Sequence, residues 1–190
     1  AGDLQSGAFT FYFARSVRPR DYVIGKLAGL GVMMAIITMA GPFLLACMRL
    51  GLCESWGDAL AHIAILPKAL AVGALAALVY AAVPLAFSAI ADTRRTALAM
   101  WAAYYLVGGF IAMMVGALTH SGWVAALDLH TAIDGVAERL FEIPNLPGKH
   151  LAPVSLAAGL TSIVVQVSAA IVLIWVNVGR AQRSGVGGST

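Results

Sequence analysis

Charged residues are scarce in this chain, and four long stretches contain none. Only 11% of the 190 residues are Asp, Glu, Lys or Arg, whereas a soluble domain carries about 25%. The uncharged stretches are strongly apolar and cover residues 27–48, 69–91, 96–119 and 151–179. Each is long enough to cross a bilayer as a helix, which takes about 20 apolar residues. The scarcity of charge therefore excludes a soluble globular protein.

The apolar stretches also lack the strict alternation of an outer-membrane barrel strand, which spans about 10 residues. Lipid leaves only helices and closed barrels as spanning structures, because every backbone polar group must be satisfied within the protein. The sequence thus predicts an all-α integral membrane protein with a bundle of four transmembrane helices. We expect a transmembrane domain at residues 27–179, preceded by a segment at 1–26 and followed by a tail at 180–190.

Catalytic and nucleotide-binding motifs are missing as well. The Gly25-Lys26 pair is not a P-loop, because Leu27 follows it where the pattern needs Ser or Thr. No G-x-S-x-G or H-E-x-x-H sequence occurs. The two cysteines, Cys47 and Cys53, could pair, but two free thiols are the favoured interpretation. We expect no catalytic residue, no metal site and no cofactor in this chain.

The basic residues flank the apolar stretches and are unevenly distributed between the two sides. They form no face that would suit a nucleic acid. If each stretch crosses once, one side carries Arg15, Arg18, Arg20, Lys26, Arg94, Arg95, Arg180 and Arg183. The other side carries Arg49, Lys68, Arg139 and Lys149. Because positive charge marks the cytoplasmic face, we expect the start, the turn at 92–95 and the tail to be cytoplasmic. The loops at 51–67 and 120–149 would then face outward.

No Asp, Glu, Lys or Arg lies at the centre of an apolar stretch, which disfavours ion-coupled carriers and proton pumps. The polar groups expected at depth are Thr38, Tyr80, Ser88, Thr161, Ser162, Gln166 and Ser168. Gln166 is a candidate for a substrate path, although an interhelical hydrogen bond is the plainer interpretation. Pro42 and Pro84 are expected to kink their helices. Small residues such as Gly73 favour close helix packing, or a seam between two subunits.

Residues 123–142 of the second outer loop have the periodicity of an amphipathic helix. Its apolar positions recur at helical spacing and are Leu129, Ile133, Val136 and Leu140, with Leu127 and Phe141 beside them. Thr131, with Asp134 three residues on, resembles a capping box. Such a helix could lie in the membrane interface. It could equally dip back to cover the outer end of the bundle.

All four histidines fall on the expected outer side: His62, His120, His130 and His150. Asp58 and His62 are four residues apart and could share a helix face, and Asp128 lies two residues before His130. The spacing matches no strong zinc motif. Solvated loop histidines are therefore the favoured interpretation.

Residues 3–26 mix aromatic side chains with positive charge and lead directly into the first apolar stretch. They contain a Ser6-Gly7 pair, an aromatic run at 9–13, and the phrases Arg15-Ser16-Val17, Arg20-Asp21-Tyr22 and Gly25-Lys26. This stretch resembles the loop after the second transmembrane helix in permease subunits of type-2 ABC exporters. The four apolar stretches, the tight basic turn and the long outer loop are similar to the third to sixth helices of that six-helix family. Because the chain starts at Ala1 without a methionine, we expect that the first two helices are missing from it.

The resemblance implies a permease that pairs with a second permease subunit, identical or different, and with a separate ABC ATPase that holds ATP and magnesium. In the family, this loop packs on the ATPase and transmits its closure. Carried over, the coupling residues here would be Phe9, Phe11, Tyr12, Arg15, Arg18, Arg20 and Asp21. Arg94 and Arg95 would form a second cytoplasmic contact. An alternative for the arginines alone is that they anchor the chain by the positive-inside rule.

The expected function is therefore ATP-driven export across the bacterial cytoplasmic membrane, with no enzymatic activity in this chain. Its uncharged interior favours a lipidic, amphiphilic or peptide-like substrate over a small ion. Two alternatives stay open. One is a membrane scaffold or assembly subunit without transport activity, and the other is a membrane enzyme with an outward-facing His/Asp site.

Overall fold

The computed structural model describes residues 19–143 and 153–186, and it contains helices and no strand within them. Four helical segments in this part are long and apolar enough to cross a membrane: Asp21–Gly51, Ile65–Ile90, Arg94–Leu118 and Leu156–Arg180. Each overlaps one of the apolar stretches of the sequence, which confirms the all-α membrane fold.

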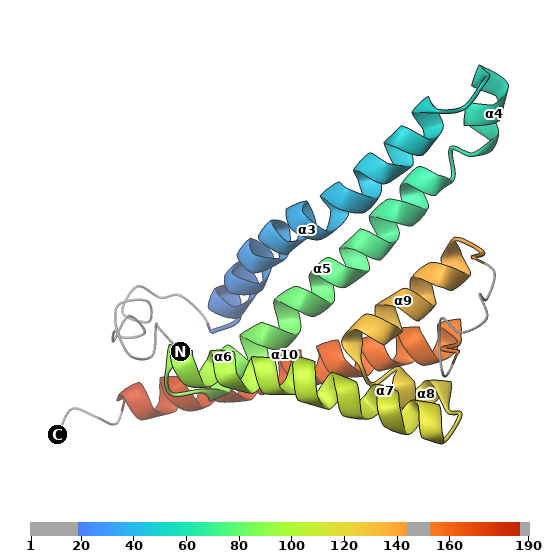
Figure 1. Cartoon of the computed structure of the whole chain (residues 1–190). Helices are drawn as coiled ribbons and strands as arrows, with labels where there is room; N and C mark the ends of the chain where they lie inside the picture. The colour runs from blue at the N-terminus through green and yellow to red at the C-terminus, as the bar shows by residue number, and fades with distance from the viewer. Residues whose placement is uncertain (1–18, 144–152, 187–190) are drawn as a thin grey trace.

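The first two spans form an antiparallel hairpin (Figure 1). Helix α3 (Pro19–Gly51) is joined to α5 (Ile65–Ile90) through the short helix α4 (Trp56–Ala61). The first helix begins well before residue 27, where the apolar stretch starts. Proline is tolerated in a first helical turn, and the carboxylate of Asp21 is favourable near the positive end of the helix dipole.

The sequence predicted a single helix for the third span, but the structure divides this span into three segments. It consists of α6 (Arg94–Ala102), the π-helical segment η1 (Ala103–Gly108) and α7 (Gly109–Leu118). The fourth span, α10 (Leu156–Val186), starts later than expected and continues into the predicted tail. Its start is set by Ser155, whose hydroxyl accepts a hydrogen bond from the Ala158 amide at 3.1 Å.

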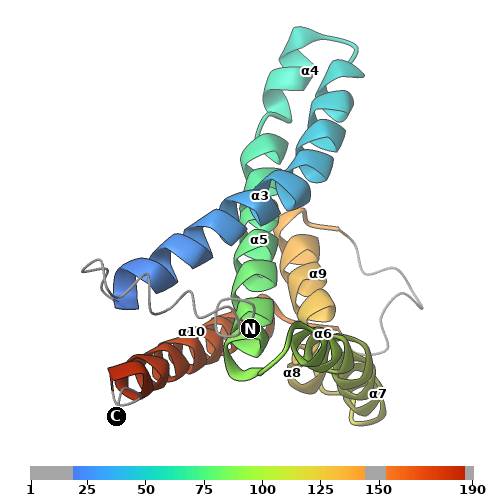
Figure 2. The same ribbon diagram turned by 90° about the vertical axis from the view of Figure 1, so that its left-hand side faces the viewer.

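Helix α5 is the centre of the fold and contacts α3, α6, α9 and α10. Half of its most apolar window is buried, whereas 6% of that window is buried in α3 and none in the third span. The third span, α10 and the outer part of the α3–α5 hairpin extend in different directions, so that the molecule is open rather than a closed bundle (Figure 2). Most of the surface of α3 and of the third span is therefore left to lipid or to another protein.

The hairpin of α3 and α5 depends on a close approach at Gly73. A Cβ atom at Gly73 would lie 2.7 Å from Met39 Cγ and 2.8 Å from Met39 Cα. The Thr38 hydroxyl lies 2.8 Å from the Gly73 carbonyl oxygen and 2.9 Å from that of Met34. Helix α3 is bent in Figure 2, in accord with this hydroxyl-to-backbone bond and with the missing amide hydrogen of Pro42.

An aromatic cluster joins α5 to the third span. The Phe87 ring centroid lies 5.4 Å from that of Tyr104 and 6.2 Å from that of Trp101. Tyr105 packs on Trp101 at 5.4 Å and edge-on against Tyr80 at 6.3 Å. Two of these rings, those of Tyr104 and Tyr105, come from the π-helical segment. The cluster therefore sets the position of the π-helix relative to the central helix.

The amphipathic helix differs from the prediction in its bounds and in its cap, and the structure decides between the two placements that were left open. It is two helices, α8 (Gly122–Ala125) and α9 (Leu129–Leu140), separated by a short break. It does not lie flat in the interface, because α9 packs between α5 and α10 (Figure 1). The proposed capping box is wrong as well: Asp128 is the N-cap, and Thr131 donates to it.

Replacing Gly73 by Val should weaken the α3–α5 hairpin. The new side chain would collide with the backbone of Met39, and overpacking of this kind costs about 1–3 kcal/mol. We expect a lower thermal unfolding temperature for purified G73V in detergent. Ala74→Val, on an exposed position of the same helix, is the matched control. Equal melting of the two variants would contradict the close approach.

Candidate functional site

Residues 122–140, which we call the re-entrant segment, fold back from the end of α7 into the bundle. Helix α8 contacts α7, and α9 contacts α10 and α5. The deepest part is nearly inaccessible: Ala125, Ala126, Leu129 and Ala132 are at most 2% exposed. The predicted apolar stripe is buried at Leu129, Ile133 and Val136, while Leu127 is 58% exposed. The dip into the bundle is thus the correct one of the two interpretations.

Two polar side chains of α10 donate hydrogen bonds to backbone carbonyls in the break between α8 and α9. The Ser162 hydroxyl donates to the Ala126 carbonyl, and the Gln166 amide donates to the Leu127 carbonyl at 3.1 Å. The same amide nitrogen lies 2.8 Å from the Ser162 hydroxyl. These carbonyls belong to backbone outside a helix, and in the hydrocarbon region of a bilayer such groups need a partner within the protein.

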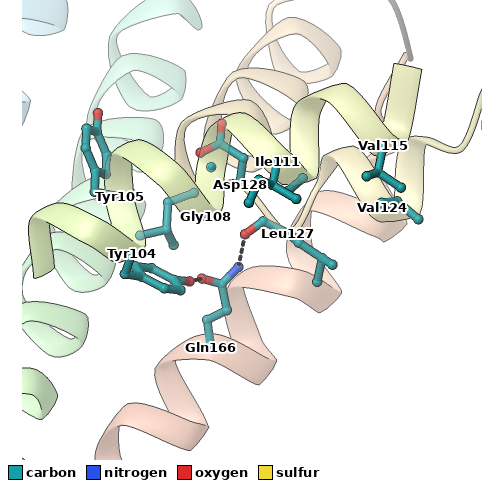
Figure 3. Close-up of a pocket in the computed structure, with 12 residues that line it drawn as sticks. Tyr104, Tyr105, Gly108, Ile111, Val115, Val124, Leu127, Asp128 and Gln166 are labelled. Carbon is teal, nitrogen blue, oxygen red and sulfur yellow. Dashed lines mark hydrogen bonds between the residues drawn. The ribbon is translucent and has the colours of Figure 1, made fainter. Parts of the chain in front are cut away.

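Gln166 also links the fourth span to the third (Figure 3). Its carbonyl oxygen accepts a hydrogen bond from the Tyr104 hydroxyl. Gln166 thus connects α10, the π-helical segment and the re-entrant segment through one side chain. The interhelical hydrogen bond expected from the sequence is present, and its role in a substrate path stays a prediction.

Asp128 is brought to the middle of the third span. One carboxylate oxygen, Oδ2, accepts hydrogen bonds from the Thr131 amide at 2.9 Å and the Thr131 hydroxyl at 2.7 Å. The other, Oδ1, lies so near Gly109 that a Cβ atom there would be 2.5 Å away. The helix from Gly109 to the end of the span at Leu118 has 10 residues, which corresponds to a rise of about 15 Å. This is half the thickness of a hydrocarbon core of about 30 Å.

A cavity of about 470 Å³ lies beside this carboxylate (Figure 3). Its lining residues are Tyr104, Tyr105, Gly108, Gly109, Ile111, Ala112, Val115, Val124, Leu127, Asp128, Leu129 and Gln166. The walls come from the third span and the re-entrant segment, and Gln166 is the contribution of the fourth. The volume falls in the range of ligand pockets, about 300–1,000 Å³. An apolar cavity with a few convergent polar groups is the usual form of a small-molecule site.

The predicted partner-coupling residues lie mostly outside the described part. Phe9, Phe11, Tyr12, Arg15 and Arg18 precede residue 19, and only the backbone of Arg20 is described. Asp21 is exposed in the first turn of α3. Arg94 and Arg95 are exposed at the start of α6, after the N-cap Thr93. In Figure 1 the starts of α3 and α6 and the end of α10 lie at one end of the molecule.

The outer histidines and cysteines form no compact metal site among the residues that the structure describes. His62 Nδ1 lies 3.2 Å from Asp58 Oδ1, and His130 Nε2 lies 3.4 Å from Asp134 Oδ2. All four of these side chains are about half exposed or more. Cys47 and Cys53 are free. His150 falls outside the described residues.

Sequence reasoning missed the interior carboxylate. The centres of the four spans carry no charged residue, as the sequence indicates, but the expectation of an uncharged interior is wrong because a loop residue, Asp128, enters it. A signal was available: Asp128 directly precedes Leu129, where the apolar stripe starts, and Asp is a preferred N-cap. Had the predicted helix begun at residue 129 rather than at 123, residues 126–128 would have been predicted as a break, with Asp128 as the N-cap.

Comparison with known families gives one match. Residues 1–179 match the family model described as ABC-2 family transporter protein. The match covers all four membrane spans and the re-entrant segment. The comparisons with curated proteins and with solved structures gave no match.

Replacing Gln166 by Leu should loosen the re-entrant segment. The change leaves the Leu127 carbonyl and the Tyr104 hydroxyl without this partner. We expect faster hydrogen exchange at residues 125–128. Asn177→Leu is the control, since the side chain of Asn177 donates to the carbonyl of Leu173 in its own helix. Unchanged exchange in Q166L would contradict the role assigned to this side chain.

Proposed function

The chain belongs to the ABC-2 transporter family, and we propose that it is the permease subunit of an ATP-driven exporter. ATP would be hydrolysed, with magnesium, by a separate ABC ATPase subunit. The observation that carries this proposal is the family match, which extends over the four spans and over the segment before them. The absence of a P-loop in the sequence is consistent with a division of labour between two kinds of subunit.

The segment at residues 1–26 is the proposed coupling element. Phe9, Phe11 and Tyr12 would insert into an apolar groove of the ATPase. Arg15, Arg18 and Arg20 would pair with acidic groups there, or with lipid phosphates. This segment continues into α3, a helix of 33 residues that reaches the outer tip of the molecule. ATPase closure would then favour one arrangement of the hairpin over another.

We assign the end that holds the starts of α3 and α6 and the end of α10 to the cytoplasm of a bacterial cell. It is the end with more Lys and Arg in the sequence, and positive charge marks the inner face. Arg94 and Arg95 would form the second contact with the ATPase. A second permease subunit, identical or different, would pack on the spans that this chain leaves exposed, of which the third has none of its apolar window buried.

The proposal is tested by affinity purification of the full-length protein from native membranes in mild detergent. We expect a P-loop ATPase in the eluate, together with ATP hydrolysis that vanadate inhibits. A stably folded protein that elutes with no ATPase and no nucleotide hydrolysis would contradict the proposal. It would favour a scaffold or assembly subunit instead.

Changing Arg15, Arg18 and Arg20 together to Gln should abolish co-purification of the ATPase while membrane insertion is retained. The physical reason is the loss of three charges that the proposal pairs with the ATPase. The matched control removes three positive charges from the outer side, in Arg49→Gln, Lys68→Gln and Arg139→Gln. Normal ATPase association in the first variant would count against the coupling assignment.

Labelling of Cys53 tests the proposed orientation of the chain across the membrane. In a Cys47→Ser background, a membrane-impermeant maleimide should label Cys53 on intact spheroplasts. In a variant lacking both cysteines, Arg94→Cys should be labelled only after the membrane is opened. The opposite pattern would reverse the proposed orientation.

The rate of this labelling also has a predicted dependence on Asp58. Partial burial and the nearby Asp58 carboxylate raise the pKa of the Cys53 thiol. Since the thiolate is the reactive form, a raised pKa makes labelling slow at neutral pH. We expect Asp58→Asn to lower this pKa and to speed the reaction. An equal or slower rate in D58N would contradict the influence of Asp58.

A further inference from the structure

We propose that the cavity beside Asp128 binds the cationic group of an amphiphile, with Asp128 Oδ1 as its counter-ion. The inference rests on the proposed function as a permease, and it narrows the substrate class to an apolar or aromatic body that carries an ammonium group. The features that carry it are the unbalanced carboxylate, the aromatic and apolar walls, and the lack of a cationic residue in the lining formed by the described part of the chain.

The carboxylate of Asp128 is only half satisfied. Both hydrogen bonds from Thr131 go to Oδ2. Within residues 19–143 and 153–186, no hydrogen bond or ion pair is directed at Oδ1. His130, two residues along the chain, lies 3.4 Å from Asp134, and Lys68 pairs with Glu142 at 3.5 Å. A lone carboxylate at membrane depth is costly, and a bound cation removes that cost.

The cavity that Oδ1 adjoins is suited to the rest of such a ligand. The rings of Tyr104 and Tyr105 line it, and tyrosine faces attract ammonium groups. Ile111, Val115 and Val124 form an apolar wall further toward the outer end (Figure 3). A ligand with a cationic head and an apolar body would therefore find both parts of its chemistry in one space.

An anionic ligand fits this cavity poorly. Among the residues that the structure describes, its lining contains no Lys, Arg or His. The Tyr104 hydroxyl and the Gln166 amide are already engaged with each other and with the backbone of Leu127. An anion would meet the Asp128 carboxylate and would lack a matching donor.

The substitution Asp128→Asn separates this role from the capping of α9. Asn is as good an N-cap as Asp, so the amide variant keeps the start of the helix and removes only the charge. Asp134→Asn is the matched control, because it removes one negative charge from the same helix at a residue that does not line the cavity.

The test measures binding of dansylcadaverine, a primary ammonium with an aromatic body, to the full-length protein in lipid nanodiscs. Empty nanodiscs give the background from partition into lipid, and N-acetylated dansylcadaverine is the neutral counterpart. We expect fluorescence titration to show saturable binding of the ammonium form. D128N should weaken it by about tenfold or more, the usual effect of losing one charge-assisted hydrogen bond. D134N should bind as the unmodified protein does.

Two results would overturn the inference: equal binding by D128N and D134N, or equal binding of the ammonium and its acetylated form. Gly109→Ala gives an independent check, because its methyl group would displace Oδ1 while the charge is kept. G109A should also weaken binding of the ammonium, and unchanged binding would oppose the proposed geometry. This assay needs no ATPase. A chain that co-purifies with an ATPase but fails this test contradicts the cavity assignment alone.

Discussion

The structure depends on how backbone carbonyls are satisfied where the chain leaves the helix inside the membrane. The break between α8 and α9 exposes the carbonyls of Ala126 and Leu127 at a depth without water, and Ser162 and Gln166 donate to them from α10. Non-helical backbone is tolerated in a bilayer only with such internal partners. The two most prominent polar residues of the last span thereby have a structural explanation, and the re-entrant segment has its anchor.

The position of the re-entrant segment has consequences for charge and for packing. Because α9 lies between α5 and α10, its N-cap Asp128 reaches the middle of the third span, although no charged residue lies at the centre of any span. The third span meets α10 chiefly through this segment and through the bond from Tyr104 to Gln166. Movement of the re-entrant segment would therefore change both the cavity and the contact between two spans. This is the kind of coupled element that an alternating transporter needs.

Hydropathy was sufficient to predict the four spans, because each crosses lipid as a long uncharged run. The stripe of Leu129, Ile133 and Val136 was also sufficient to predict an amphipathic helix, but not whether its apolar face packs on the bundle or lies in the membrane interface. The π-helical turn at 103–108 leaves no comparable signal, since Tyr104 and Tyr105 read as ordinary helical residues. The cavity could not be predicted either. It arises from long-range contacts, such as that of Asp128 with Gly109, that hydrophobic periodicity does not encode.

The depth of the break at residues 126–128 is the most direct test of this account. A nitroxide on Leu127→Cys, in a chain without other cysteines and in lipid nanodiscs, can be compared with labels at Ile111 on the third span and at Trp56 on the outer tip. The account predicts that position 127 has the high oxygen and low nickel-chelate accessibility of position 111. Accessibility equal to that of position 56 would mean that the segment lies on the membrane surface, and would contradict the account.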